Sequence, residues 1–434
     1  MAAAEPSASI APGHADRVDD DGGAPARWKL VGPGLVVAAT GVGAADMVAT
    51  LVAGSRYGYG LLWAVVLGVI LKIILVEGAG RYTLATGRTI FEGWRTLGRW
   101  TTWYFGPYIM VWGFVYGATA MSSSAMPLAA LFPSIDLKVW AVAMGLAGFV
   151  MVWFGHYAFF EKITAVLVGI MFVSVVGLAI IALPNVPAMF RGLVPTIPAG
   201  GMLYTLALAG GVGGTITLAA YGYWLREKGW YTPKWMRVMR IDNAMAYIIT
   251  GIFVVSMLIV GAEVVRAAGV SLSAGDEGLL DLTKVLEERY GKVVGTGFLV
   301  GFWAASFSSV IGVWNGVSLM FADFWGTIRG LPSGHPDTRV GGKYFRFYVL
   351  WLTFPPMVLF LLDKPIFLIL LYGVLGSLFM PFLAVTLLGL LNGNRAPRGW
   401  GNSALSNVLL AITAALFIAL GAQQLWTELA RLFR

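Results

Sequence analysis

The sequence predicts an all-α integral membrane protein, and three observations support that prediction. Of its 434 residues, 58% are hydrophobic and only 12% are charged, whereas a water-soluble domain usually carries about 25% charged residues. Apolar stretches of helical length recur from about residue 30 to the end of the chain, and a membrane span takes about 20 mostly apolar residues. Two of these stretches contain glycine clusters. This pattern leaves no room for a separate water-soluble domain.

The apolar stretches predict about eleven transmembrane helices. In chain order they are expected near residues 30–57, 59–84, 101–131, 137–155, 160–184, 200–228, 236–262, 293–325, 345–362, 365–391 and 403–427. Residues 1–27 are rich in Ala, Pro, Gly and Asp and lack an apolar core, so we expect a disordered cytoplasmic tail and no signal peptide. Residues 28–434 are then a single transmembrane domain.

The positive charges orient these spans. With the N-terminus in the cytoplasm, the basic loops at 81–99, 226–240, 329–346 and 395–398 all lie inside, while the acidic loop at 263–292 lies outside. This is the bias of multi-pass proteins of the plasma (inner) membrane. An odd number of spans places the C-terminus outside, and a count of ten or twelve would put one basic cluster on the wrong side. Residues 276–290 have near-helical spacing of acidic and apolar residues, which predicts a short surface helix.

The composition also limits the classes of function. The net charge of +8 is explained by topology, so we expect no nucleic-acid partner, and the partners expected are the lipid bilayer and a solute. The chain has no cysteine, which excludes disulfides and thiolate metal sites. It shows no metal-binding His spacing, no nucleophile with a base and no phosphate loop, so an enzyme or a non-transporting sensor is the least favoured class. We expect no cofactor and a monomer.

The glycine clusters predict breaks in two transmembrane helices. They are residues 39–46 (ATGVGAAD) in the first span and 210–215 (GGVGGT) in the sixth. Glycine costs up to about 1 kcal/mol in a helix interior, and unwound backbone within a membrane is tolerated only when it is buried or lines a polar cavity. The alternative is that the glycines only allow close helix packing. Matched breaks in two successive five-helix units indicate an inverted-repeat transporter, with repeats at 30–184 and 200–391 and an extra helix at 403–427.

Several motifs resemble those of the Nramp family of divalent metal transporters. They are GVGAAD at 41–46 preceded by Gly32 and Pro33, SRYGYGLLW at 55–63, ATGRT at 85–89, SFSSVIG at 306–312 and LFMPF at 378–382. The resemblance covers nearly the whole chain after the tail. It implies a LeuT-like five-plus-five inverted repeat with one additional helix, in which helices 1 and 6 are broken, and a secondary-type membrane transporter for divalent cations.

The positions that bind metal in that family differ in this chain. The family's Asp-Pro-Gly-Asn motif, whose Asp and Asn bind the metal, corresponds to Gly43, Ala44, Ala45 and Asp46. Its Met-Pro-His motif, with a metal-binding Met and a His tied to proton movement, corresponds to Thr217 and the two residues after it. The carboxylate therefore takes the Asn position, and a hard hydroxyl replaces a soft thioether.

The family's proton path is also altered. The acidic pair of its third span corresponds to Ala120 and Ser123, and a glutamine of its tenth span corresponds to Gly373. Loss of the His and both carboxylates removes the titratable groups of a side-chain proton relay. We therefore expect transport without proton coupling.

These residues predict a cation site built from oxygen ligands. We expect the carboxylate of Asp46, the hydroxyl of Thr217 and the carbonyls of Gly43 and Gly214 to bind Mg²⁺, with Mn²⁺ as a further candidate cargo. Such a site resembles that of the magnesium-transporting relatives of the Nramp family. Supporting positions are Thr40, Ala45, Gly213, Ser123 and Gly373.

Alternatives stay open for each part of this site. Asp46 can instead cap the outer half-helix, and the Thr217 hydroxyl can bond back to its own helix. The pocket can also take a small organic solute or a monovalent ion, as in amino-acid carriers of this fold. Glu77 and Arg81 have i,i+4 spacing and form either a structural ion pair or a gating contact.

Overall fold

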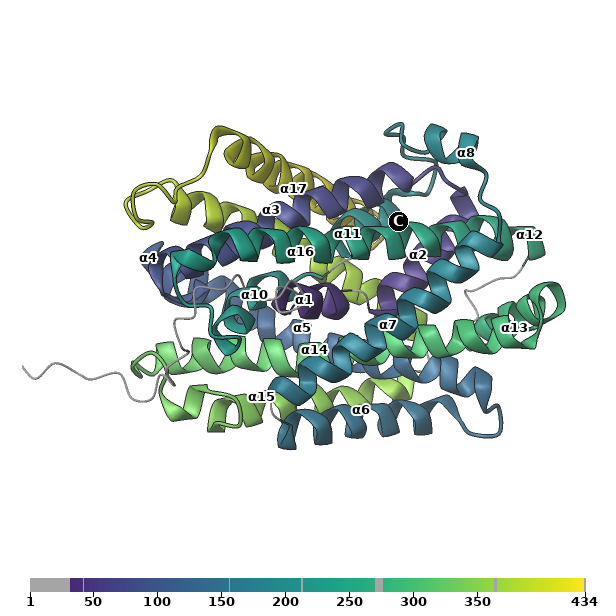
Figure 1. Cartoon of the computed structure of the whole chain (residues 1–434), viewed down its shortest axis with the longest axis horizontal. Coiled ribbons are helices and arrows are strands. Elements are labelled where there is room, and N and C mark those ends of the chain that lie inside the picture. Colours follow the sequence, from purple (N-terminus) through teal and green to yellow (C-terminus); the bar gives the residue numbers. More distant parts are fainter. Residues whose placement is uncertain are drawn as a thin grey trace, which may run out of the picture.

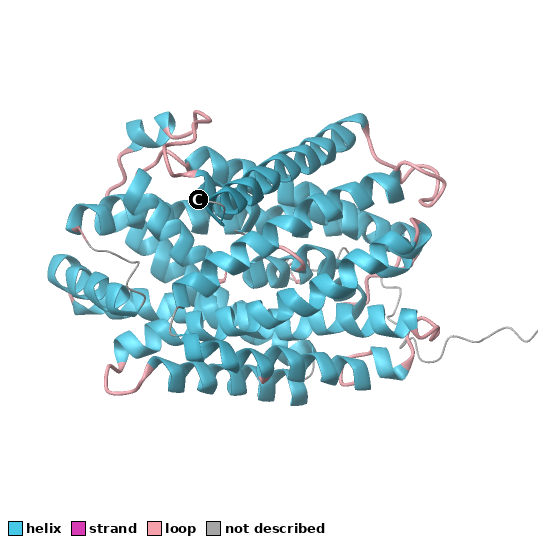
Figure 2. Ribbon diagram, turned by 180° about the vertical axis from the view of Figure 1, so that it is seen from behind, coloured by secondary structure: helices cyan, strands magenta, loops and turns pink. Residues whose placement is uncertain are grey.

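The chain folds into a bundle of helices, with no strand in the described residues (Figures 1 and 2). The computed structural model describes residues 32–41, 43–155, 157–211, 214–269, 276–362 and 365–432. The tail predicted at 1–27 lies outside these ranges. The helical bundle itself confirms the predicted fold class.

Each predicted span coincides with one helix or with consecutive helical segments. The first five are α1 (Pro33–Gly41) with α2 (Ala44–Tyr57), α3 (Leu62–Thr86), α5 (Arg99–Leu131), α6 (Leu137–Phe154) and α7 (Tyr157–Ile181). The others are α9 (Met202–Leu206) with the π-helix η2 (Ala207–Gly211) and α10 (Thr217–Glu227), α11 (Met236–Val260), α14 (Lys292–Ile328), α15 (Lys343–Thr353) with the 3₁₀-helix η7 (Pro355–Leu362), α16 (Pro365–Leu391) and α17 (Ala404–Leu432). Within the described residues, seven helices are long and apolar enough to cross a membrane, so the count of eleven stays a prediction.

Short helices form the two ends of the bundle. One end carries α4 (Ile90–Thr96), η3 (Pro233–Trp235) and η6 (Pro336–Thr338), and the opposite end carries α8 (Val186–Arg191), η4 (Gly261–Val265), α12 (Arg266–Ala268) and α13 (Asp276–Tyr290). Figure 1 shows α4 far from α8, α12 and α13. The helix predicted at 276–290 is α13. Helix α4 begins with a capping box between Thr89 and Glu92.

Burial separates the central helices from those at the lipid-facing perimeter. In α14, 72% of the most apolar window is buried, against 22% in α6 and 29% in α17. Figure 1 places α6 and α17 on opposite edges of the bundle. Apolar side chains point outward from the perimeter helices, for example Val150 of α6, Val173 of α7 and Ile418 of α17. An apolar exterior of this kind is suited to lipid and not to water.

Both predicted helix breaks are present. Helix α1 ends at Gly41, Gly43 has no regular structure and α2 begins at Ala44. In the sixth span, α9 passes into the π-helix η2, which ends at Gly211, and a new helix begins only at Thr217. The π-helical turn widens the backbone spiral just before the break, as such turns often do near functional sites.

The ninth span differs from the predicted single helix. Helix α15 ends at Thr353, and the 3₁₀-helix η7 begins at Pro355. Pro355 and Pro356 have no backbone N–H, so two consecutive hydrogen bonds of an α-helix cannot form at the pair. Length and hydropathy alone did not indicate this change.

Glycines fix how the two broken helices pack on the rest of the bundle. A Cβ at Gly54 of α2 would lie 2.6 Å from the carbonyl oxygen of Leu258 in α11, and one at Gly68 of α3 would lie 2.8 Å from the carbonyl oxygen of Ala209 in η2. Each broken helix thus packs on the second helix of the opposite repeat, α2 on α11 and η2 on α3. Such reciprocal contacts between the two halves fit an inverted repeat.

The Gly54 contact makes a prediction about stability. We expect Gly54→Ala to lower the thermal unfolding midpoint by a few degrees, because all the nearest atoms are backbone and overpacking costs about 1–3 kcal/mol. Gly169→Ala is the matched control, since a Cβ at that helical glycine of α7 meets no atom within 4 Å. Thermal unfolding in detergent measures both variants. Equal midpoints for the two would contradict the close backbone contact.

Candidate functional site

The two helix breaks meet in the interior. Gly214 has a φ of +97°, a conformation that favours glycine. A Cβ at Gly214 would lie 2.6 Å from Thr217 Oγ1 and 3.4 Å from the Cα of Gly41. The end of α1 and the segment just before α10 therefore pack closely against each other.

Two threonine hydroxyls at the second break have no hydrogen-bond partner among the described residues. Thr215 is 1% exposed and Thr217 is 2% exposed, and neither Oγ1 makes a hydrogen bond there. A buried polar group without a partner costs about 1–3 kcal/mol. The back-bonding alternative for Thr217 is not observed, so its buried hydroxyl makes no hydrogen bond within the described residues.

The first break presents the start of α2. Asp46 lies in the first turn of that helix, but its side chain and that of Ala45 are outside the described part of the structure. The carbonyl of Gly43 accepts the Met47 N–H at 3.1 Å, so Gly43 is the N-cap of α2. Asp46 follows it by three residues and is the third residue of the helix. A carboxylate at this position interacts favourably with the helix N-terminus, and the capping alternative for Asp46 stays open.

The predicted supporting positions within the described residues lie on several helices. The Thr40 hydroxyl donates to the carbonyl of Val36 at 2.6 Å, and the Ser123 hydroxyl donates to the carbonyl of Thr119 within α5. Gly373 lies within α16, and Gly213 falls outside the described residues. The hydroxyl protons of Thr40 and Ser123 are thus used within their own helices. Their roles, like those of the proposed ligands, stay predictions.

The sequence analysis missed a buried carboxylate that holds α1. Asp242 of α11 accepts the N–H of Gly32 at 3.1 Å and of Gly34 at 2.6 Å, and its Oδ2 also accepts the hydroxyl of Tyr221 at 2.9 Å. These amides belong to the N-cap residue and the first turn of α1, where N–H groups have no partner within the helix. Asp242 therefore caps α1 from a distance and joins it to α10 and α11. A single acid in an apolar span was the available signal.

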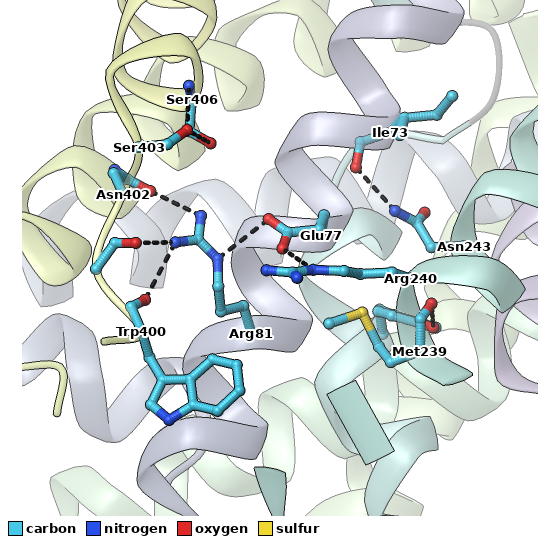
Figure 3. Close-up of polar contacts among 12 residues, drawn as sticks. Ile73, Glu77, Arg81, Met239, Arg240, Asn243, Trp400, Asn402, Ser403 and Ser406 are labelled. Atoms are coloured by element: carbon cyan, nitrogen blue, oxygen red, sulfur yellow. Dashed lines mark hydrogen bonds and ion pairs between the residues drawn. The ribbon is translucent and has the colours of Figure 1, made fainter. Parts of the chain in front are cut away.

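Glu77 and Arg81 form the predicted ion pair, and their surroundings favour a structural role (Figure 3). Arg81 is 4% exposed and donates to the carbonyls of Trp400 and Gly401 and to the Asn402 side chain. Glu77 also pairs with Arg240 at 2.9 Å. Figure 3 shows α3, α11 and the segment before α17 joined by these contacts.

Each end of the bundle has a polar cavity that is separate from the breaks. The cavity near α4 measures about 400 Å³ and includes Tyr223 and Asp323, whose side chains share a 2.6 Å hydrogen bond. The cavity near α8 measures about 320 Å³ and includes Tyr59 and Glu263, joined at 2.7 Å. In each cavity a tyrosine hydroxyl donates to a carboxylate: Tyr223 joins α10 to α14, and Tyr59 joins the turn before α3 to η4. Neither cavity is lined by Thr215 or Thr217.

Comparisons with known proteins agree with this architecture. The family model described as Nramp, natural resistance-associated macrophage protein-like, matches residues 34–427. The divalent metal cation transporter MntH of Chromohalobacter salexigens is 25% identical over 319 residues, covering 69% of this chain and 72% of the relative. MntH of Mycobacterium tuberculosis is 22% identical over 307 residues, covering 68% and 70%.

Two solved structures share the fold. A manganese transporter of Eremococcus coleocola, in complex with an aromatic bis-isothiourea compound, has a TM-score of 0.76 at 15% identity and covers 95% of this chain and 90% of its own. MhsT in complex with L-phenylalanine has a TM-score of 0.61 at 15% identity and covers 90% and 96%. The predicted LeuT-like fold is confirmed.

The ion-pair cluster makes a prediction that separates its buried and exposed parts. We expect Glu77→Ala to destabilise the protein by about 3 kcal/mol, because it leaves the buried Arg81 guanidinium without its carboxylate. Arg240→Ala is the matched control, since Arg240 is 52% exposed and exposed pairs contribute about 0–1 kcal/mol. Thermal unfolding of both variants in detergent measures the difference. A larger loss of stability from Arg240→Ala would mean that the exposed Arg240–Glu77 pair contributes more to stability than the buried Arg81–Glu77 pair.

Proposed function

The chain belongs to the Nramp family, and from that premise we propose that it is a secondary-type transporter of divalent cations with Mg²⁺ as its principal cargo. The observation that carries this proposal is the buried hydroxyl of Thr217, which has no hydrogen-bond partner among the described residues and lies where the two helix breaks meet. The MntH relatives are named as divalent metal cation transporters, and the structural relative from Eremococcus coleocola is a manganese transporter. The cation is the substrate and no cofactor takes part.

The donor set supports Mg²⁺ over softer ions. Thr217 stands where the family resemblance places a methionine, so the site offers a carboxylate, a hydroxyl and backbone carbonyls. Oxygen ligands suit Mg²⁺, while a thioether favours softer metals. Mg²⁺ keeps several of its waters and commonly uses one or two carboxylates. Asp46 supplies the negative charge, and Gly43 and Gly214 contribute carbonyls.

We further propose that transport does not depend on a proton gradient. Ala120 and Ser123 occupy the positions of the family's acidic pair, and the Ser123 hydroxyl is hydrogen bonded within its own helix. Neither side chain can take up a proton in the physiological range. The protein acts as a monomer in the plasma membrane, with its N-terminus in the cytoplasm and its C-terminus outside.

A second candidate cargo is a small organic solute. It is favoured by the shared fold with MhsT, whose structure contains L-phenylalanine. In that case the free hydroxyls and backbone at the breaks would bind a polar group of the solute in place of a cation. Transport assays with each class of cargo separate the two proposals.

The first test removes the proposed ligands. In proteoliposomes loaded with a Mg²⁺-sensitive dye, we expect Asp46→Ala to abolish uptake, because a bare oxygen pocket cannot offset the dehydration of a divalent cation. Thr217→Ala should raise the KM about five-fold, as expected for a lost hydrogen-bonding or ligand group. The control is Thr413→Ala, since Thr413 donates to Leu409 within α17. Undiminished uptake by Asp46→Ala would reject the site.

The second test concerns selectivity. Thr217→Met restores a thioether at the break, and we expect it to shift the Mn²⁺ to Mg²⁺ uptake ratio about ten-fold toward Mn²⁺. Competition between the two cations in the same liposomes measures the ratio. An unaltered uptake ratio would show that position 217 does not face the cargo.

The same liposomes test proton coupling. A pH gradient of either direction should leave the uptake rate of the wild-type protein unchanged.

A further inference from the structure

A line of three buried hydrogen-bonding groups runs from α5 through α14 to the end of α1. The Ser309 hydroxyl of α14 lies 2.8 Å from the carbonyl oxygen of Thr40, and the Tyr116 hydroxyl of α5 lies 2.6 Å from Ser309 Oγ. Thr40, Tyr116 and Ser309 are each 4% exposed or less. The contact connects the end of a broken helix to two continuous helices.

The direction of these bonds follows from counting protons. Ser309 has one hydroxyl proton, and the carbonyl of Thr40 has none to give, so Ser309 donates to Thr40. The Tyr116 hydroxyl must then be the donor in its 2.6 Å contact with Ser309 Oγ, and it also lies 3.4 Å from the Ser309 carbonyl oxygen. Two hydroxyls in series polarise one another, so each bond strengthens the next.

This contact acts at a specific point of the break. Thr40 belongs to the last turn of α1, where four carbonyls have no partner within the helix, and Ser309 satisfies one of them. The next residue is Gly41, which lies beside Gly214. The close approach requires Gly312, one turn further along α14, because any side chain there would overlap that of Thr40. The position of α1 relative to the second break is therefore set from α14.

We infer that Ser309 and Tyr116 are positioning residues of the transport site, which hold the end of α1 in the arrangement that binds the cargo. This inference rests on the proposed transport function. Neither residue touches the cargo: Ser309 acts through the Thr40 carbonyl, and Tyr116 acts through Ser309. Tyr116 also stacks on Trp112 at 4.6 Å, so its ring keeps its packing when the hydroxyl is removed.

The experiment combines Ser309→Ala, Tyr116→Phe and the double variant. We expect Ser309→Ala to raise the KM for Mg²⁺ about five-fold with a smaller change in maximal rate, and Tyr116→Phe to raise it about two-fold. The double variant should match Ser309→Ala alone, because the two bonds act in series. Ser308→Ala is the matched control, since that neighbouring hydroxyl donates to Ala305 within α14.

Amide hydrogen exchange provides a readout that does not depend on the cargo. Residues 36–41 should exchange faster in Ser309→Ala and Tyr116→Phe than in Ser308→Ala, while α3 and α17 are unchanged. A KM equal to that of Ser308→Ala, or additive effects in the double variant, would overturn the inference. So would faster exchange without a change in KM. A wild-type protein that carries no Mg²⁺ would reject the proposed cargo, and the exchange comparison would still decide whether α14 positions α1.

Discussion

The constraint on which this structure depends is that backbone polar groups inside a membrane must find partners within the protein. A continuous helix satisfies its own backbone groups, but each of the two interrupted helices leaves amides and carbonyls without a partner at its ends and at the break. Other parts of the described structure bind several of these groups. Asp242 takes the amides at the start of α1, Ser309 takes a carbonyl at its end, and the Gly43 carbonyl starts α2. Among the buried side-chain groups that have no hydrogen-bond partner in the described residues are the hydroxyls of Thr215 and Thr217. These two hydroxyls lie at the second break, where a polar cargo would satisfy them.

Close backbone packing fixes one helical segment beside each break against the rest of the bundle. Gly54 against α11 and Gly68 against η2 bring helices into contact without side chains between them. In a bilayer, where lipid tails are as apolar as leucine, such close packing is a main source of helix association. The glycines of this chain therefore have two separate roles. Gly43 and Gly214 lie where helices are interrupted, while Gly54 and Gly68 join helices.

The sequence alone predicted the fold better than the site. Hydropathy and the positions of the glycine clusters located the helices and both breaks, because these are local properties of the chain. The 3₁₀-helix after Pro355 and the capping box at Thr89 were missed, although both have local signals. Asp242 is 210 residues from Gly32, and no local spacing connects the two. Ser309 lay within a recognised motif, but the motif does not indicate which neighbour its hydroxyl contacts. For Thr217, only the coordinates distinguish a free hydroxyl from one bonded to its own helix.

The carboxylate of Asp242 has a consequence for how the protein can move. It is shared by the first turn of α1, by Tyr221 of α10 and by its own helix α11. If α1 swings outward, two amides and a carboxylate oxygen lose their partners together, at a cost of several kcal/mol in a dry interior. Water must therefore reach that carboxylate as the helix leaves. Hydration of this junction is then a step in the motion itself.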